Sequence, residues 1–452
     1  MRRTKRLSSA PPDGATAAAK PAPERPSAPD MSARRCLAIC AVVFVLAHVA
    51  LLIGLSTPDK FVFDEFHYVP AARQLLQPVL PQPLLNPMHP PLAKQFIALS
   101  IRVFGDNGFG WRYPGALFGA LAIVAVYLCG LVLFAAQGPA IAAALIAFFN
   151  QMLFVQARTA MLDIFALSFG LFAIAAFMRG FREERPHLWF TLAGIGFGLS
   201  AACKWNGFFP LLVSLLIVAV VRLLQGWGTR FADPGPDDWY RPDLWPDFKW
   251  YHATGCFLIV PALVYFATFV PLYGPSPSDI MEAQRRIFAD NTTTAIAGHT
   301  YQSAWPTWPL LVRPVWYLFD KAAEGRIAAI VFLGNPLVLW PALLALAICL
   351  RDFIARRSAD AFLILAFYAG TYLAWALLPR SLAFLYYYLP AATLASLALV
   401  YALTRGNTPR WLLWAFVAVA AAGFAVMLPI SAASVGTSMQ MFNRLMLFRS
   451  WI

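Results

Sequence analysis

Charged residues are scarce in this sequence. Only 13% of its 452 residues are Asp, Glu, Lys or Arg, whereas 60% are hydrophobic. This composition excludes a soluble multidomain enzyme and is typical of a polytopic membrane protein. The formal net charge of +13 does not indicate nucleic-acid binding, because the basic residues collect in short connectors and in the N-terminal tail, as the positive-inside rule predicts.

Several common functional motifs are also missing. The sequence has no P-loop, no dinucleotide fingerprint and no Cys/His metal motif. Its six cysteines lie in or at the ends of apolar runs without metal-ligand spacing, so neither a disulfide framework nor a zinc site is indicated. There is no convincing internal repeat, and the ionisable residues cluster at one face. A secondary transporter would more typically show repeats and polar residues near the midplane, so the pattern favours chemistry at the membrane surface.

Long hydrophobic runs dominate what is present. Residues 1–35 are rich in Ala, Pro, Ser, Arg and Lys and predict a disordered cytoplasmic tail. Residues 36–430 predict an all-α polytopic membrane domain with about 11 transmembrane helices, and residues 431–452 an extracytoplasmic tail. The membrane-length runs are 36–56, 114–134, 139–157, 161–178, 188–203, 207–224, 251–273, 328–350, 360–378, 382–402 and 411–429.

The charge distribution predicts the orientation of these spans. With the basic N-terminal tail in the cytoplasm, alternation places the Arg-rich connectors inside and the loops 57–113 and 274–327 outside. Between Lys94 and Asp106 apolar residues recur at helical spacing, which predicts an amphipathic helix along the membrane surface. The two outer loops face away from cytoplasmic ATP and nucleotide sugars.

The first outer loop contains the adjacent carboxylates Asp64 and Glu65, set between two phenylalanines. Such a pair is costly at a membrane boundary unless a polar cavity or a partner accommodates it, and for the pair alone a solvated loop is an equal alternative. His89 and Lys94 in the same loop favour a site for proton transfer beside an anionic leaving group.

Three cations lie at the outer ends of predicted spans. Arg112 is either an interface anchor or an anion-binding group that faces a cavity. Lys204 interrupts two apolar runs and needs a counter-ion, for which a lipid phosphate is suitable. Arg380 adds a further cation on the same side.

Two other outer features have alternative interpretations. Arg158 and Asp163 lie five residues apart and form either a structural ion pair that fixes a tight turn or part of a catalytic site, the structural role being at least as plausible. The segment from His299 to Tyr317, which includes Trp305, is dense in Trp and Pro. It is either an interfacial aromatic belt or a platform for a carbohydrate or lipid head group.

Taken together and in order, segments over residues 60–392 resemble the protein O-mannosyltransferase family of GT-C glycosyltransferases. Two departures are visible: the loop from His299 to Tyr317 leaves no room for the MIR domain of eukaryotic members, and Ala93 stands where the family commonly has Gly. The segments that carry the resemblance are FDEFHY, NPMHPPLAK, WRYPGALFGAL, RTAMLDIF, CKWNGFFP, WPLLVRPVWY with LGNP, and PRSLAFLYYYLPA.

The resemblance implies a compact bacterial enzyme of the inner membrane with an extracytoplasmic active site. Its donor would be mannose on a polyprenyl phosphate, and its acceptor a Ser/Thr hydroxyl of a secreted protein. Asp64 would be the base of a single inverting displacement, and Glu65 would position the acceptor. The candidates for binding the donor phosphate are Arg112, Lys204 and Arg380, and those for the acceptor or its loop are His89, Lys94, His299 and Trp305.

Other functions fit parts of the same pattern. The similar aminoarabinose transferases of this structural class modify lipid A, so an envelope lipid or glycan is an alternative acceptor. A non-enzymatic exporter of lipid-linked sugars is the alternative from a different functional class. The expected displacement requires no cofactor, although a carboxylate pair with one His could hold a divalent cation.

Overall fold

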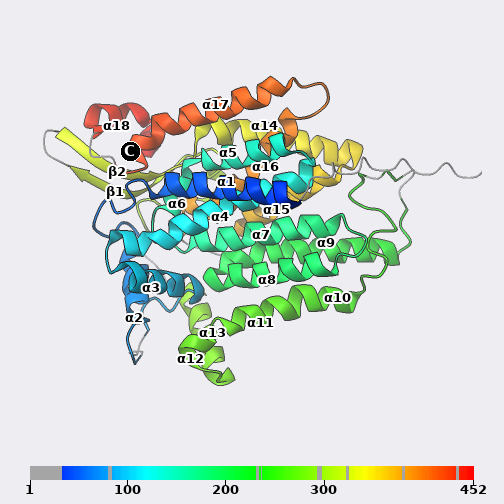
Figure 1. The fold of residues 1–452 in the computed structure, drawn as a ribbon, viewed down its shortest axis with the longest axis horizontal. Helices are drawn as coiled ribbons and strands as arrows, with labels where there is room; N and C mark the ends of the chain where they lie inside the picture. The colour runs from blue at the N-terminus through cyan, green and yellow to red at the C-terminus, as the bar shows by residue number, and fades with distance from the viewer. Residues whose placement is uncertain are drawn as a thin grey trace, which may run out of the picture.

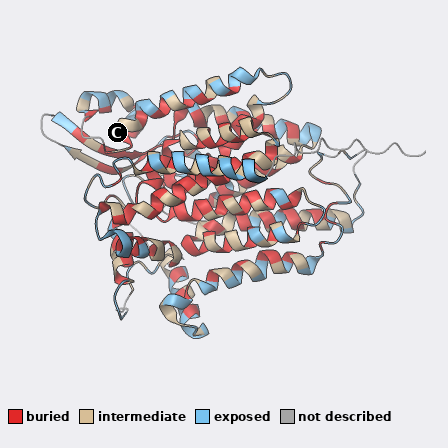
Figure 2. Cartoon of the chain, viewed as in Figure 1, coloured by how far each residue is buried: buried red, intermediate tan, exposed pale blue. Residues whose placement is uncertain are grey.

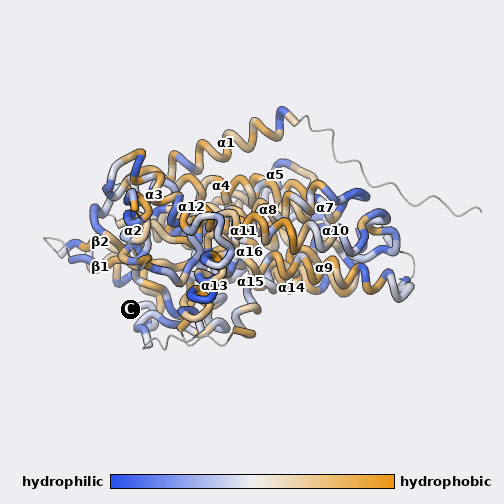
Figure 3. Tube along the Cα trace, turned by 90° about the horizontal axis from the view of Figure 1, so that it is seen from below, coloured by the Kyte–Doolittle hydropathy of each residue, from blue (hydrophilic) through white to orange (hydrophobic). Residues whose placement is uncertain are grey.

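The structure is a computed structural model that describes residues 33–79, 84–230, 234–235, 237–292, 298–321, 325–378, 382–433 and 437–452. Long apolar helices run roughly side by side, with hydrophobic residues along the middle of the bundle and hydrophilic residues mostly at its two ends (Figure 3). Within the described ranges, nine helical segments are long and apolar enough to cross a membrane. They are Ala33–Leu52 (α1), Gly108–Phe134 (α4), Asp163–Phe181 (α7), Trp205–Gly226 (η1 and α9), Trp250–Ala267 (α10, η2 and α11), Pro336–Arg356 (α14), Ala359–Leu377 (α15), Leu385–Leu403 (η5 and α16) and Arg410–Ile430 (α17 and η6).

Two of the predicted runs take other forms. The run 139–157 is divided into Gln137–Phe148 (α5) and Gln151–Ala157 (α6), which are bent by 68°. Asn150 causes the break locally, since its side chain accepts a hydrogen bond from the Met152 N–H and caps the second helix. The run 188–203 forms His187–Cys203 (α8), which has 17 residues and is shorter than the other spans. The predicted count of 11 is therefore not confirmed; counting the bent pair as one span gives ten in the described residues.

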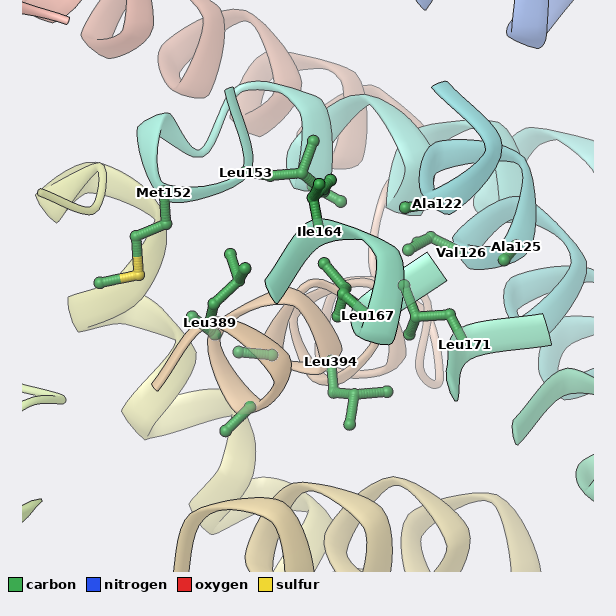
Figure 4. Close-up of a cluster of buried hydrophobic side chains, with 14 of the residues drawn as sticks. Ala122, Ala125, Val126, Met152, Leu153, Ile164, Leu167, Leu171, Leu389 and Leu394 are labelled. Atoms are coloured by element: carbon green, nitrogen blue, oxygen red, sulfur yellow. The ribbon is translucent and has the colours of Figure 1, made fainter. Parts of the chain in front are cut away.

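The helices pack closely around α4, α7 and α16, where the buried residues concentrate, whereas α1 is exposed along much of its length (Figure 2). Small residues allow this approach: a Cβ on Gly119 of α4 would lie 2.4 Å from that of Ala157. Figure 4 shows the side chain of Leu153 beside Ile164 of α7, and that of Leu167 between Ile164 and Leu394 of α16. This core fixes the ends of α4, α6 and α7, from which several residues of the site extend.

A small sheet is an exception to the predicted all-helical fold. Val315–Lys321 (β1) and Arg326–Phe332 (β2) pair antiparallel, and Thr437–Ser438 (β3) pairs with the other edge of β2. The predicted span at 328–350 is therefore wrong in its first residues, since α14 begins at Pro336. Short apolar runs fit a buried strand as well as a helix, and β2 is rich in β-branched residues.

The C-terminal residues pack against this sheet, where the sequence predicted a tail. Met439–Leu445 (α18) follows β3, and Trp451 is fully buried. The Trp451 Nε1 donates to the carbonyl of Leu311 at 2.6 Å, and the Trp316 Nε1 donates to the carbonyl of Trp451 at 3.0 Å. These bonds hold the segment before β1 against the end of the chain.

The elements outside the bundle gather at one end of it. Glu65–Gln74 (α2), Leu92–Phe104 (α3), the sheet and α18 lie at the left in Figure 1, and Val270–Tyr273 (α12) and Pro277–Thr292 (α13) complete this layer. The amphipathic helix predicted after Lys94 is confirmed as α3, which buries Ile97 and Ile101 and exposes Leu99 and Val103. The Ala33 end of α1 lies at the opposite end of the bundle.

Candidate active site

The two adjacent carboxylates have different surroundings. Phe63 has a positive φ of 43°, and α2 starts immediately after Asp64. Successive residues on a helix diverge by about 100°, so the two side chains point in different directions. Glu65 is fully buried and accepts four hydrogen bonds: from Arg112 Nε and Nη2, at 2.8 and 2.9 Å, and from the backbone N–H groups of Val62 and Ala160, at 2.9 and 2.8 Å. Glu65 therefore links α2 to α4 and to the α6–α7 turn.

Arg112 is the other half of this buried pair. A guanidinium has five N–H donors. Two donate to Glu65, and the other three donate to the carbonyls of Leu55, Pro58 and Lys60, at 3.3, 2.7 and 2.7 Å. A donor phosphate could bind Arg112 only if these bonds broke. The geometry therefore does not support the phosphate-binding role expected of Arg112 or the acceptor-positioning role expected of Glu65.

Arg158 and Asp163 do not form the expected ion pair with each other. Arg158 donates to the carbonyls of Leu51, Ile53 and Gly54, at 2.7, 2.6 and 3.1 Å. These carbonyls lie at the end of α1, where helical C=O groups lack partners and the helix dipole favours a cation. Arg158 and Arg112 together fix the chain from the end of α1 to the start of α2.

Asp163 instead pairs with Lys204, whose Nζ lies 2.8 and 2.9 Å from the two carboxylate oxygens. Both side chains are buried. The ammonium group also lies 5.1 and 5.4 Å from the ring centroids of Tyr386 and Tyr387. The counter-ion that the sequence required for Lys204 is therefore present within the protein. Since an ammonium has three N–H donors and two of them point to Asp163, one donor is left for another acceptor.

Asp64 is only half-buried and carries few hydrogen bonds. Within the described ranges its side chain accepts one, from the Tyr68 hydroxyl at 3.4 Å. Removal from water raises the pKa of Asp64 above its ordinary value; the positive charges of Lys204 and His67 oppose this shift and the charge of Asp163 adds to it. A carboxylate with a raised pKa and little hydrogen bonding is suited to accept a proton.

The remaining predicted residues lie around this centre. Lys94 Nζ donates to the carbonyls of Asn86 and His89, at 2.7 and 2.9 Å, and burial lowers the pKa of Lys94 to about 7. The His89 ring lies 5.9 Å from the ring of Tyr68, the residue whose hydroxyl donates to Asp64. These contacts give Lys94 and His89 a clear role in shaping the first loop.

Two predicted residues of the aromatic segment, His299 and Trp305, contribute less directly. His299 is exposed and makes an edge contact with Phe384, at 5.2 Å between ring centroids. Trp305 packs against Tyr372 of α15, at 5.4 Å. Arg380 lies outside the described residues, so its expected role in phosphate binding stays a prediction.

The predicted aromatic segment from His299 to Tyr317 supplies Tyr301, Trp316 and Tyr317 to a groove, whose other wall, in the first outer loop, was not predicted from the sequence. Phe63 stacks on Tyr317 of β1, with 4.5 Å between ring centroids and 3° between planes. Both residues line a groove of about 670 Å³ between the first outer loop and β1. The groove is also lined by Lys60, Phe61, Phe66, Arg73, Trp111, Tyr301, Trp316, Leu318 and Phe319. The available sequence signal was the density of aromatic residues in VWYLF and in FDEFHY.

Metal ligands do not converge here. In the part of the chain that the structure describes, no group of three His, Cys, Asp or Glu side chains could hold a metal ion. The described residues bring together a half-buried carboxylate, a buried cation and an aromatic groove.

Two family models match consecutive parts of the chain. Residues 41–272 match the model described as dolichyl-phosphate-mannose-protein mannosyltransferase. Residues 277–451 match the model of the C-terminal four-transmembrane region of protein O-mannosyltransferase. The first match alone covers half of the chain and includes Asp64, Glu65, Arg112, Asp163 and Lys204.

Curated bacterial proteins resemble the chain over most of its length. A polyprenol-phosphate-mannose–protein mannosyltransferase of Mycolicibacterium smegmatis is 28% identical over 403 residues, 75% of this chain and 76% of that protein. The protein of the same name from Mycobacterium tuberculosis is 27% identical over 422 residues, 79% and 77% of the two chains. Both relatives are matched over more than two thirds of their own length.

Solved structures share the fold. A chain of the Saccharomyces cerevisiae protein O-mannosyltransferase Pmt1-Pmt2 complex bound to the sugar donor superposes with a TM-score of 0.75, at 14% identity, over 93% of each chain. ArnT from Cupriavidus metallidurans bound to undecaprenyl phosphate gives 0.57 at 14% identity, over 89% of this chain and 75% of that one. The predicted GT-C fold is therefore confirmed.

Proposed function

This chain belongs to the dolichyl-phosphate-mannose-protein mannosyltransferase family, and we propose that it transfers mannose from a polyprenyl phosphate to a hydroxyl group of a protein. The observation that carries the proposed mechanism is the contrast between the two neighbouring acids. Glu65 accepts hydrogen bonds from four donors, whereas within the described ranges the Asp64 carboxylate accepts one long hydrogen bond, from Tyr68. We therefore assign the role of catalytic base to Asp64. Glu65 instead fixes the position of the loop that carries Asp64, through its bonds to Arg112 and to the backbone.

The reaction is a single displacement. Asp64 takes the proton of a Ser or Thr hydroxyl while the hydroxyl oxygen attacks the anomeric carbon of the mannose. The bond from that carbon to the phosphate oxygen breaks, and its electron pair leaves with the polyprenyl phosphate. The configuration at the anomeric carbon inverts because the nucleophile and the leaving group lie on opposite sides. No cofactor is needed for these steps, since the protein supplies the base and the leaving group is already an activated phosphate.

Lys204 is the described cation best placed for the leaving phosphate. Its charge is close enough to Asp64 to influence the pKa of that carboxylate, and Asp163 fixes its position. One ammonium N–H remains for a phosphate oxygen. A preorganised cation in a site that excludes water stabilises developing negative charge without reorganisation. Asp163 is thus a positioning residue for Lys204, and Arg112 performs the same task for the loop that carries Asp64.

The acceptor class is tested with purified protein. We expect mannose to pass from polyprenyl-phosphate mannose to a Ser/Thr-containing peptide of secreted-protein sequence, with the product identified by mass spectrometry and its anomeric configuration by NMR. An envelope lipid fraction offered in parallel should not become labelled. Labelled lipid with unlabelled peptide would instead establish the lipid acceptor, and transport of lipid-linked mannose without any glycoside product would establish an exporter.

We also propose that the protein lies in a bacterial inner membrane, with the active site on the extracytoplasmic side. The Asp64 end of the bundle also carries the C-terminal residues, and the Ala33 end of α1 lies at the other end (Figure 1). A reporter fused after Ile452 should therefore be active only when it is translocated across the membrane. An alkaline phosphatase fusion is active only outside the cytoplasm, whereas a green fluorescent protein fusion fluoresces only inside it. Activity of the cytoplasmic reporter would reverse the proposed orientation.

A further inference from the structure

The groove beside Asp64 has a strand edge as one of its walls. We propose that the acceptor polypeptide binds there in an extended conformation, as an additional strand on the free edge of β1. This inference rests on the proposed function, because a protein acceptor must bring its hydroxyl to Asp64. It goes further in that it names the conformation and the backbone contacts by which the acceptor is recognised.

The sheet topology leaves this edge open. The strand order is β1-β2-β3, so β1 is an outer strand that pairs only with β2 among the described residues. Four consecutive residues, Trp316 to Phe319, line the groove. The β1–β2 register shifts between Trp316 and Leu318, so the regular alternation of side chains is interrupted there, and the groove follows β1 across this irregularity. Unpaired N–H and C=O groups of such an edge are a template for another extended chain.

The opposite wall is aromatic and belongs to the catalytic loop. Phe61, Phe63 and Phe66 surround the position of Asp64 in the sequence, and all three line the groove. The stacked rings of Phe63 and Tyr317 join the two walls at the residue that precedes Asp64. A strand bound along β1 would therefore pass Asp64, with alternate side chains directed toward this aromatic wall.

The size and the ends of the groove fit a short peptide segment. A volume of about 670 Å³ lies within the usual range of about 300 to 1,000 Å³ for ligand sites. Lys60 and Asp320 form an ion pair at 2.6 Å across from the first loop to β1, and both side chains are about half-exposed. This pair bridges the two walls, with Asp320 close to the end of β1. Main-chain hydrogen bonds would hold the segment and leave its sequence variable apart from the hydroxyl residue.

Backbone-modified acceptor peptides test this without altering the enzyme. A strand directs the N–H of every second residue toward its neighbour. In a peptide with one Ser, N-methylation at successive positions should raise KM at alternate positions only. Each sensitive position should show an increase of about two- to tenfold, the effect expected of one lost hydrogen bond. Replacing the same amide by an ester removes the N–H without adding a methyl group and should reproduce the pattern.

The controls separate the binding mode from the function. The unmodified peptide must become mannosylated; if it does not, the proposed function fails and the modified peptides are not informative about it. If the unmodified peptide is a substrate and all N-methylated peptides are used equally well, the strand-addition mode is wrong. A loss that is equal at consecutive positions would also overturn it, because that pattern indicates steric exclusion or a non-extended acceptor.

Discussion

Asp64→Asn is expected to reduce the rate of mannose transfer by about 10² to 10⁴, because it keeps the shape of the side chain but removes the base. The change should act on kcat and leave donor binding nearly intact, since Asp64 acts on the acceptor hydroxyl. The measurement is turnover of purified protein at saturating donor over a range of acceptor peptide concentrations. Binding of a polyprenyl-phosphate donor analogue, measured in parallel, provides the comparison.

Tyr68→Phe is the matched control for this variant. It removes the one hydrogen bond that the Asp64 carboxylate accepts within the described ranges, at 3.4 Å, but keeps the carboxylate and the aromatic packing. We expect a much smaller loss of kcat, because this long bond contributes little. If Asp64→Asn retained near wild-type turnover while its donor binding was normal, the base would have to be another residue.

The pH dependence of the wild-type enzyme identifies the same group. Burial raises the folded-state pKa of Asp64 above its ordinary value of 3.8. The base is active when it is deprotonated, so kcat/KM should fall as the pH decreases through this raised pKa, at a higher pH than for a solvent-exposed Asp. Tyr68→Phe removes a hydrogen bond that stabilises the charged form. In that variant the acidic limb should move to higher pH, which an unrelated titrating group would not do.

The sequence predicted the helical architecture and the location of the site because both depend on local patterns. Membrane-length apolar runs are visible without knowledge of tertiary contacts, and Asp64 is conspicuous among so few charges. The sheet was missed because RIAAIVF is a short continuous apolar run, for which a buried strand and part of a helix look alike. The bend at Asn150 was missed because one capping residue does not alter the average hydropathy of its run.

The roles of individual charged residues required the tertiary structure. Glu65 and Arg112 lie 47 positions apart, and Asp163 and Lys204 lie 41 apart, so no spacing rule connects either pair. The proximity of Arg158 and Asp163 in the sequence suggested a pairing that the fold does not make. Which of two adjacent acids is free to react depends on the donors that surround it, and those of Glu65 come from three segments: the first outer loop, α4 and the α6–α7 turn.

Glu65→Gln is expected to destabilise the protein by about 3 to 5 kcal/mol, because it leaves the Arg112 charge buried without its counter-ion. This differs from the effect of losing an acceptor contact, which would raise KM and leave stability unchanged. The free energy of unfolding is measured by denaturation in detergent micelles with tryptophan fluorescence as the signal. The comparison is Lys60→Met, which removes the half-exposed pair with Asp320 and should cost about 1 kcal/mol or less.

A second substitution separates burial of an unpaired charge from loss of the pair itself. In Glu65→Gln combined with Arg112→Met, both charges are gone, so the double variant should recover part of the stability that the single variant loses. It should remain less stable than the wild type, because the carbonyls of Leu55, Pro58 and Lys60 also lose their donor. If Glu65→Gln were instead as stable as the wild type and raised only the acceptor KM, Glu65 would contact the acceptor directly. The buried Arg112–Glu65 pair would then have to open during catalysis.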